Sequence, residues 1–455
     1  MSAKIKEVKS RIATRADVGG HMIAGIGQNL IFGFWSSYML KFYTDIFGLT
    51  AAFVGVLFLV ARVWDAVDDP LMGMVVDRTR TKWGRFRPWL LFMALPVGIF
   101  MVLNFSAPDL PATSKMVYAA ITYFLMSVAF SSVDIPYWSL PAAITTDPQE
   151  RTKIYSLSKM GANVISALVG MVTIPLVQVL GKGNLKTGFF YVAIIYAIIG
   201  AVTYISGFFM IREHVEASTD KFDFKKSLSA ISKNKPLVMV MIANFLINVG
   251  LLLRMNLNVY YAEYNLGNIG RVAILSLVSL PGIIIGSLLA PKLAKLLGKK
   301  KAIIGSNLFL LVLGIVFYFM GYSNFTAIII LSAIQMLVIG CEMVILMSMN
   351  ADTIEYAEWK TGQRNEGVIS STQTFVAKLG MGVTGAIAAL VLSVSGYVPN
   401  AVQTVGTLNA FHFIVSLMPG LIGVLACVPI VFYELTEERH AQIVAEIKER
   451  KNNAQ

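Results

Sequence analysis

The chain has 455 residues, of which 56% are apolar and only 14% are charged. Soluble domains carry roughly a quarter charged residues, so this composition excludes an ordinary soluble protein and predicts segments that lie in lipid. The formal net charge of +12 suggests nucleic acid at first, but lysine and arginine concentrate in alternate loops between apolar segments. We therefore interpret the charge as setting orientation in a membrane, and we expect no nucleic-acid partner.

Apolar stretches of about 20 residues, the length that crosses a bilayer, recur from Ile23 to Tyr433. We predict twelve transmembrane helices, at 21–45, 50–76, 89–107, 113–143, 157–180, 187–211, 237–263, 269–297, 301–321, 325–351, 365–395 and 407–433. The first stretch lacks a small-residue cleavage site, so we expect no cleaved signal peptide. Cys341 and Cys427 both lie in apolar segments, which predicts neither a disulfide framework nor a thiolate metal site.

Basic residues follow the second, fourth, sixth and eighth spans, and both ends of the chain are basic. By the positive-inside rule these loops and both termini are cytoplasmic, which requires an even number of crossings. We predict a multi-pass protein of the cytoplasmic (inner) membrane that functions as a monomer in contact with lipid.

The longest internal polar stretch falls near the middle of the chain and separates six spans from six. This pattern favours an all-α major facilitator fold of two pseudo-symmetric halves around a midplane site. We predict a cytoplasmic N-terminal segment at 1–20, one half at 21–211, a cytoplasmic middle loop at 212–236, the other half at 237–433, and a cytoplasmic tail at 434–455.

The second span contains carboxylates where lipid should exclude them. Asp65 and Asp69 lie four residues apart and share one helical face. Two such carboxylates repel unless a cation or a proton neutralises them, so we predict that they bind a coupling ion, H⁺ or Na⁺. The alternative is a structural ion pair, with Arg62 or with a cation of another helix. Asp68 faces elsewhere, and its role stays open.

The fourth span places Asp134, Pro136 and Trp138 within two turns of a helix. A carboxylate accepts hydrogen bonds from sugar hydroxyls, and a flat indole stacks on the apolar face of a pyranose, so this group predicts a sugar site. The alternative has Trp138 as a packing or interface residue and Asp134 paired with Lys159.

Further polar residues lie in or beside the later spans. Lys378, deep in the eleventh span, can supply a counter-charge to the carboxylates of the second. Arg254 and Glu342 are predicted to pair with each other rather than to contact substrate. The acidic run after the tenth span can pair with basic loops as a cytoplasmic gate, the alternative being a solvated loop. The predicted gate residues are Arg151, Asp352, Glu355, Glu358 and Arg364.

The sequence contains no GxxxxGK[ST] loop, no HExxH motif and only four histidines. We therefore expect neither an enzyme nor an ATP-driven pump, and no cofactor or resident metal beyond the transported cation.

Four segments together resemble the glycoside-pentoside-hexuronide:cation symporters, the melibiose permease family. They are 62–70, the basic loop 77–88, 134–140, and the acidic run 352–358 with Lys360 and Arg364. The resemblance implies a symporter that works by alternating access. It places the cation site at Asp65 and Asp69, with Ser131 and Lys378 nearby. It places the sugar site at Gln28, Asn29, Asp134, Trp138, Lys159 and Thr374.

Three positions depart from the melibiose carrier. Asn29 stands where that carrier has an aspartate, Lys159 where it has an arginine, and Asp68 where it has an asparagine. Lysine lacks the bidentate fork of arginine, and asparagine donates as well as accepts, so galactoside specificity does not transfer. Members that carry acidic sugars tend to have asparagine at the position of Asp134, because a carboxylate repels an anion.

We therefore predict import of a neutral glycoside or pentoside by symport with H⁺ or Na⁺. The alternatives are a carrier of an acidic sugar, with Arg254 holding the acid group, and a lipid or amphiphile transporter. A non-transporting receptor or a membrane enzyme is disfavoured, because the sequence offers no catalytic constellation.

Overall fold

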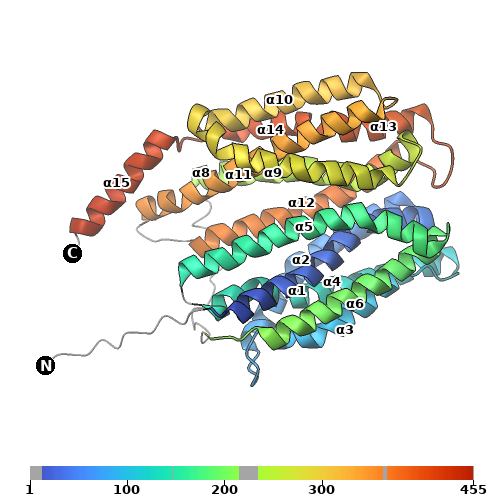
Figure 1. Ribbon diagram of the computed structural model, residues 1–455, viewed down its shortest axis with the longest axis horizontal. Coiled ribbons are helices and arrows are strands. Elements are labelled where there is room, and N and C mark those ends of the chain that lie inside the picture. Colours follow the sequence, from blue (N-terminus) through green and yellow to red (C-terminus); the bar gives the residue numbers. More distant parts are fainter. Residues whose placement is uncertain (1–12, 146, 215–233, 362–365, 454–455) are drawn as a thin grey trace. The chain divides into compact units, whose positions relative to one another are not determined.

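The computed structural model describes residues 13–145, 147–214, 234–361 and 366–453, and every regular element in these ranges is a helix (Figure 1). The chain divides into two compact units, residues 1–220 and 221–455. The division falls within 212–236, the predicted middle loop, whose cytoplasmic location stays a prediction.

The first unit contains six long helices. They are α1 (Arg15–Lys41), α2 (Ala51–Arg78), α3 (Arg87–Asn104), α4 (Ala112–Ile144), α5 (Pro148–Gly181) and α6 (Leu185–Met210). Helix α1 is central, because it packs against α4, α5 and α6. Helix α2 packs on α4, and α3 packs on α4 and α6.

The second unit repeats this plan with one broken helix. Its elements are α8 (Lys235–Tyr260), α9 (Arg271–Leu297), α10 (Lys299–Met320), α11 (Phe325–Thr361), α12 (Glu366–Val394), α13 (Val405–Ser416), α14 (Met418–Val431) and α15 (Glu437–Asn453). Helices α13 and α14 meet at an angle of 48° and correspond to the single predicted span 407–433. Pro419 follows the break, where a proline is tolerated in the first turn of a helix.

The first helix of each unit ends in a π-helical turn. Helix α1 continues into η1 (Phe42–Ile46), and α8 continues into η2 (Tyr261–Asn265). π-Helical turns are rare, so their recurrence at corresponding places marks the two units as structural repeats. This is the pseudo-symmetry that the sequence predicted for a major facilitator fold.

Eight helices of the described ranges are long and apolar enough to cross a membrane, and the bent pair α13 and α14 makes a ninth candidate. Helices α1, α2 and α12 fall outside this group, although we predicted a span at each. Helix α2 contains Arg62, Asp65, Asp68 and Asp69, which lower its mean hydropathy. Polar residues inside a membrane protein face its interior or a pathway, so such helices are where function is expected.

Helices of the first unit approach each other closely at glycines. A Cβ at Gly25 of α1 would collide with the hydroxyl of Tyr137 on α4. Beside it, His21 stacks on the Tyr137 ring at 4.4 Å and contacts Ser158 of α5 at 2.8 Å. These contacts fix α1 against α4 and α5, where the candidate sugar residues lie.

The turn before α3 is held by one carboxylate. Glu213 accepts hydrogen bonds from the backbone N–H groups of Arg85, Phe86 and Arg87, at 2.8, 2.7 and 2.9 Å. Gly84 is required here, because its φ is +110° and a Cβ would collide with this carboxylate. The basic loop 79–86 is thereby tied to the end of α6.

Asp17 closes the same end of the first unit. It is 1% exposed and accepts hydrogen bonds from the Thr14 hydroxyl at 2.6 Å, the Arg212 N–H at 2.7 Å and His214 Nε2 at 3.0 Å. Burial by itself raises the pKa of a carboxyl group, but the hydrogen bonds from Thr14, His214 and Arg212 outweigh it and lower the pKa of Asp17 below its ordinary 3.8.

We expect Asp17→Asn to lower the thermal stability of the protein at pH 7, by about 2 kcal/mol for the lost charge-assisted hydrogen bonds. A lowered pKa stabilises the fold above the unfolded value, and this stability is lost as the pH falls through the folded value. The variant should therefore lose less stability than the natural protein as the pH falls from about 5 to about 2. Thermal unfolding in detergent measures this, with the exposed Asp109→Asn as the matched control. An equal loss of stability on acidification in Asp17→Asn and in the natural protein would contradict this role of Asp17.

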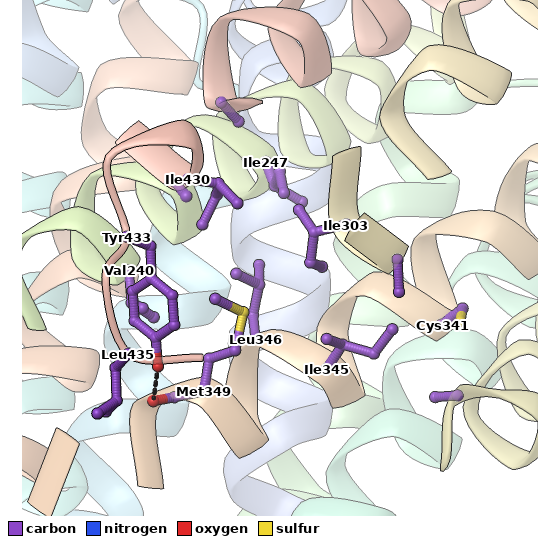
Figure 2. Close-up of a cluster of buried hydrophobic side chains, with 14 of the residues drawn as sticks. Val240, Ile247, Ile303, Cys341, Ile345, Leu346, Met349, Ile430, Tyr433 and Leu435 are labelled. Atoms are coloured by element: carbon purple, nitrogen blue, oxygen red, sulfur yellow. Dashed lines mark hydrogen bonds between the residues drawn. The ribbon is translucent and has the colours of Figure 1, made fainter. Parts of the chain in front are cut away.

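The core of the second unit is an apolar cluster to which α8, α9, α10, α11, α14 and α15 all contribute (Figure 2). Tyr433 is 1% exposed, and its hydroxyl donates to the carbonyl of Met349 at 3.4 Å. Ile443 and Ile447 add one face of α15 to the cluster. The predicted tail 434–455 thus contains a helix that packs on the second unit.

Candidate functional site

Helix α4 brings four polar or aromatic candidates onto one face. Ser127, Ser131, Asp134 and Trp138 follow each other at spacings of four, three and four residues, which places them on one stripe of an α-helix. Ser131 and Asp134 are about 4.5 Å apart along the axis, at 1.5 Å of rise per residue. Ser131, one of the predicted cation residues, therefore lies on the same helical face as Asp134 and Trp138, two of the predicted sugar residues.

Asp134 lies at the centre of a network from three helices. Its Oδ1 accepts hydrogen bonds from Gln28 Nε2 of α1 at 2.6 Å and from Trp138 Nε1 at 3.0 Å. The Oε1 of Gln28 in turn accepts a bond from the Tyr204 hydroxyl of α6 at 2.5 Å. Gln28 and Tyr204 are buried, so their side chains are held in place. The structure thus brings together Gln28, Asp134 and Trp138, and their role in binding sugar stays a prediction.

Asn29 is not part of this network. Its Nδ2 donates to the carbonyl of Gly25 at 2.7 Å, one turn back on its own helix. The helix positions of Lys159 on α5 and Thr374 on α12 are described, but their side chains lie outside the described residues. The predicted sugar contacts of these three residues stay predictions.

Asp65 of α2 is engaged from two sides. Arg62 Nη1 donates to its Oδ2 at 2.8 Å, and the Ser127 hydroxyl of α4 donates to its Oδ1 at 2.5 Å. The side chains of Arg62 and Asp65 are 21% and 14% exposed, so this ion pair is largely shielded from water. The structure therefore contains the Arg62 pair that we left open as an alternative for this carboxylate.

Helices α2 and α4 run parallel in a fixed register. Asp65 contacts Ser127, and further along both helices Met72 Sδ lies 3.7 Å from the Ser132 hydroxyl. These two contacts join residues 62 and 60 positions apart in sequence, so Ser131, which is 6% exposed, lies at about the level of Asp69. Asp65 thus contacts Ser127, and Asp69 and Ser131 lie one turn further along the same two helices. All four side chains offer oxygen, the ligand that hard cations prefer.

Two predicted residues of the second unit fall outside the description. The side chain of Lys378 on α12 and the whole of Arg364 lie outside the described residues. The counter-charge role of Lys378 and the gate role of Arg364 therefore stay predictions.

The structure does not bring Arg254 and Glu342 together as we predicted. The guanidinium of Arg254 donates to Gln335 Oε1 of α11, and Gln335 Nε2 donates to the carbonyl of Ser416 at 2.9 Å. Glu342 lies seven residues beyond Gln335 on α11, about 10 Å along the axis. Neither of its oxygens has a hydrogen-bond partner among the described residues. Opposite charge alone was the basis of the predicted pair, and it does not place two side chains on facing helices.

The acidic run at the end of α11 contacts basic groups of its own unit. Lys299 Nζ lies 2.5 Å from Asp352 Oδ2, and His440 Nε2 of α15 lies 3.9 Å from Asp352 and 3.7 Å from Glu355. Glu358 is 8% exposed. In the first unit, Arg151 Nη2 donates to the carbonyl of Thr145 at 3.2 Å. The gating role of these residues stays a prediction.

Sequence reasoning missed two residues of the site, Tyr204 and Ser127. Tyr204 is one of several tyrosines in apolar spans, and nothing in the sequence sets it apart. Ser127 lies about one turn before Ser131 on the stripe of α4, so a helical-wheel argument from Asp134 could have found it.

Comparison with known proteins identifies the family. The model for MFS/sugar transport proteins matches residues 20–437. The chain belongs to this family. It is therefore a multi-pass membrane transporter and not an enzyme.

Curated relatives match along nearly the whole chain. An isoprimeverose transporter of Lactiplantibacillus pentosus is 34% identical over 441 residues, covering 93% of this chain and 91% of its own. A glucuronide carrier protein homolog of Escherichia coli K12 is 32% identical over 439 residues, covering 95% of each chain. The crystal structure of the nucleoside transporter NupG superimposes with a TM-score of 0.64 over 92% of this chain and 100% of its own. At 14% identity NupG shows the fold alone, and together with the family model it confirms the predicted major facilitator fold.

Proposed function

We propose that this transporter imports a neutral glycoside or pentoside together with a cation, H⁺ or Na⁺, by alternating access in the cytoplasmic membrane. Both termini are cytoplasmic in this proposal. The stripe of α4 carries it, because Ser127 donates to Asp65 of α2 while Ser131, Asp134 and Trp138 continue the same face. The names of the relatives, an isoprimeverose transporter and a glucuronide carrier homolog, support a sugar as substrate.

The sugar is held by Asp134 and Trp138. A carboxylate hydrogen-bonded by sugar hydroxyls gains charge-assisted bonds of about 1.5–3 kcal/mol each. Gln28 Nε2 and Trp138 Nε1 already donate to this carboxylate, so the donors of a sugar can exchange with them at little cost. The bond from Tyr204 keeps the amide of Gln28 oriented with its donor toward Asp134.

The coupling cation is bound by Asp65 and Asp69 with the Ser131 hydroxyl. Arg62 supplies the positive charge beside Asp65 in this structure, and an incoming cation competes with it. Such an exchange gives α2 two arrangements with similar charge balance, which is what a switch between two states requires. Because α2 contacts α4 through Ser127, the exchange reaches the helix that carries Asp134.

An acidic sugar is the second candidate, and the glucuronide carrier homolog favours it. An anionic substrate would need a cationic partner to offset the charge of Asp134. Arg254 is 2% exposed and bonded to Gln335, so it would have to leave this bond to reach a sugar. This requirement is why we place the neutral substrate first.

Uptake into proteoliposomes tests both candidates. Labelled neutral glycosides, pentosides and glucuronides are offered one at a time under an imposed Na⁺ or H⁺ gradient. We expect accumulation of a neutral sugar that one of the two gradients drives. Accumulation of acidic sugars alone would establish the second candidate, and no gradient-driven accumulation of any sugar would contradict symport.

A further inference from the structure

The core of the second unit contains a carboxyl group that the proposed transport cycle does not use. Glu342, near the middle of α11, is 0% exposed, and both of its oxygens lack a hydrogen-bond partner in the described part of the chain. Asn307 of α10 is also 0% exposed. Its Nδ2 donates to the carbonyl of Ile303 at 3.0 Å, while its Oδ1 receives no hydrogen bond from any described residue.

One stripe of α14 faces both residues. A Cβ at Gly423 would collide with Oδ1 of Asn307, so this oxygen points directly at α14. Cys427, one turn further along the same stripe, lies within electrostatic range of Glu342. Residues four apart on a helix are neighbours on its surface, so Asn307 and Glu342 meet α14 at adjacent places.

Asn307 and Glu342 lie at similar levels along the axes of α10 and α11. Lys299 of α10 contacts Asp352 of α11, which aligns these consecutive, oppositely running helices at one end. From that contact Asn307 lies eight residues along α10, about 12 Å, and Glu342 lies ten residues back along α11, about 15 Å. The two side chains thus occupy one layer of the core, to within a single helical turn.

The surroundings of this layer are apolar. Ile303, Cys341, Ile345 and Ala426 belong to the same buried cluster (Figure 2). The thiols of Cys341 and Cys427 are the titratable groups of α11 and α14 near Glu342. The sequence of α8 holds no titratable residue between Lys235 and Arg254, that of α9 none between Arg271 and Lys292, and that of α10 none between Lys301 and Tyr318.

The charged residues nearest to Glu342 along the helices contact other groups. Arg254 donates to Gln335, two turns from Glu342, and Asp352 at the end of α11 contacts Lys299 and His440. The side chain of Lys378 on α12 lies outside the described residues. The layer therefore combines three buried acceptor oxygens, Oε1 and Oε2 of Glu342 and Oδ1 of Asn307, with no donor from the described residues.

We propose that Glu342 binds a proton in the folded protein and donates its carboxylic O–H to Oδ1 of Asn307, forming a proton site in the second unit. A single proton removes the charge from an apolar layer and supplies the donor that the acceptors require. The site is separate from the cation residues of α2. Its failure would leave the proposed sugar symport untouched.

A proton held by the folded chain and released by the unfolded chain links stability to pH. The ratio of folded to unfolded protein falls as the pH rises, by up to tenfold per pH unit while Glu342 stays protonated. In Glu342→Gln the amide N–H can donate to Asn307 in place of the acid, and the residue no longer titrates. We therefore expect this variant to fold and to transport sugar. Its stability should no longer fall as the pH rises from neutral to alkaline.

Infrared spectroscopy of the purified protein in ²H₂O tests the proton directly. We expect the natural protein to show a protonated carboxylic C=O band at neutral pH that is absent in Glu342→Gln, and to be less stable to heat at pH 8 than at pH 6. Asn307→Leu should shift the band, because the acid loses its hydrogen-bond acceptor. Asp109→Asn, at an exposed site, is the control and should leave the band and the slope unchanged.

Two results would overturn the proposal. The first is an identical carboxylic spectrum in the natural protein and Glu342→Gln, which would mean that Glu342 is ionised. The second is stabilisation of the natural protein by Na⁺ at constant pH that Glu342→Gln abolishes, since the ligand would then be a metal cation. If Glu342→Gln fails to fold, the band shift in Asn307→Leu still decides whether Glu342 is protonated or ionised.

Discussion

Replacing Asp134 with alanine is expected to abolish measurable sugar binding while leaving the protein folded. The substitution removes the acceptor of Gln28 Nε2 and Trp138 Nε1 and, in our proposal, of the sugar hydroxyls. Loss of one charge-assisted hydrogen bond weakens binding by about 1.5–3 kcal/mol, so loss of two should reduce affinity at least about 100-fold. Isothermal titration calorimetry with the sugar identified in the uptake panel measures it.

Two variants sharpen this test. Asp109→Asn removes a carboxylate from an exposed position and should bind sugar normally. Trp138→Phe keeps an aromatic face but removes the indole N–H, so it should bind more weakly than the natural protein and more tightly than Asp134→Ala. Normal affinity in Asp134→Ala would remove this residue from the site, whatever the other variants do.

Replacing Asp69 with asparagine is expected to abolish concentrative uptake and to spare sugar exchange across the membrane. Asparagine has nearly the same shape but carries no charge, so the pair on α2 loses half of its attraction for a cation. Downhill exchange needs sugar binding but no ion gradient. We expect accumulation under an ion gradient to fall to the passive level, about 100-fold, while counterflow of labelled sugar persists.

Proteoliposomes with and without an imposed gradient measure both activities on one preparation. The neighbouring Asp68→Asn is the informative comparison, because it changes the same charge one residue away on a different helical face. Unchanged accumulation in Asp69→Asn would refute the assignment of this carboxylate to the cation. Loss of exchange and accumulation together would instead assign Asp69 to the fold or to the sugar site.

Hydropathy alone predicted a helix at each of the twelve spans, because a lipid environment forces long apolar helices on the chain. It could not predict the bend between α13 and α14, or the π-helical turns after Lys41 and Tyr260, since these depend on packing between helices. Nor did it predict α15, whose apolar residues Ile443 and Ile447 are too few to register as a hydrophobic segment.

The candidate site followed from the sequence where its residues share a helix. Asp134 and Trp138, or Asp65 and Asp69, face the same way at a spacing of four, and this needs no knowledge of tertiary structure. Partners on other helices did not follow. Tyr204 and Ser127 were missed, and Arg254 was assigned to Glu342 although it bonds to Gln335, because charge matching ignores which faces of two helices meet.

The most direct test of the account is the sugar affinity of the purified protein, measured by calorimetry with and without the coupling cation. We predict that the cation tightens sugar binding, and that the sugar tightens cation binding by the same factor, because linkage between two sites is reciprocal. The factor should fall to one in Asp69→Asn. A cation effect on sugar affinity that survives intact in Asp69→Asn would contradict coupling through the stripe of α4.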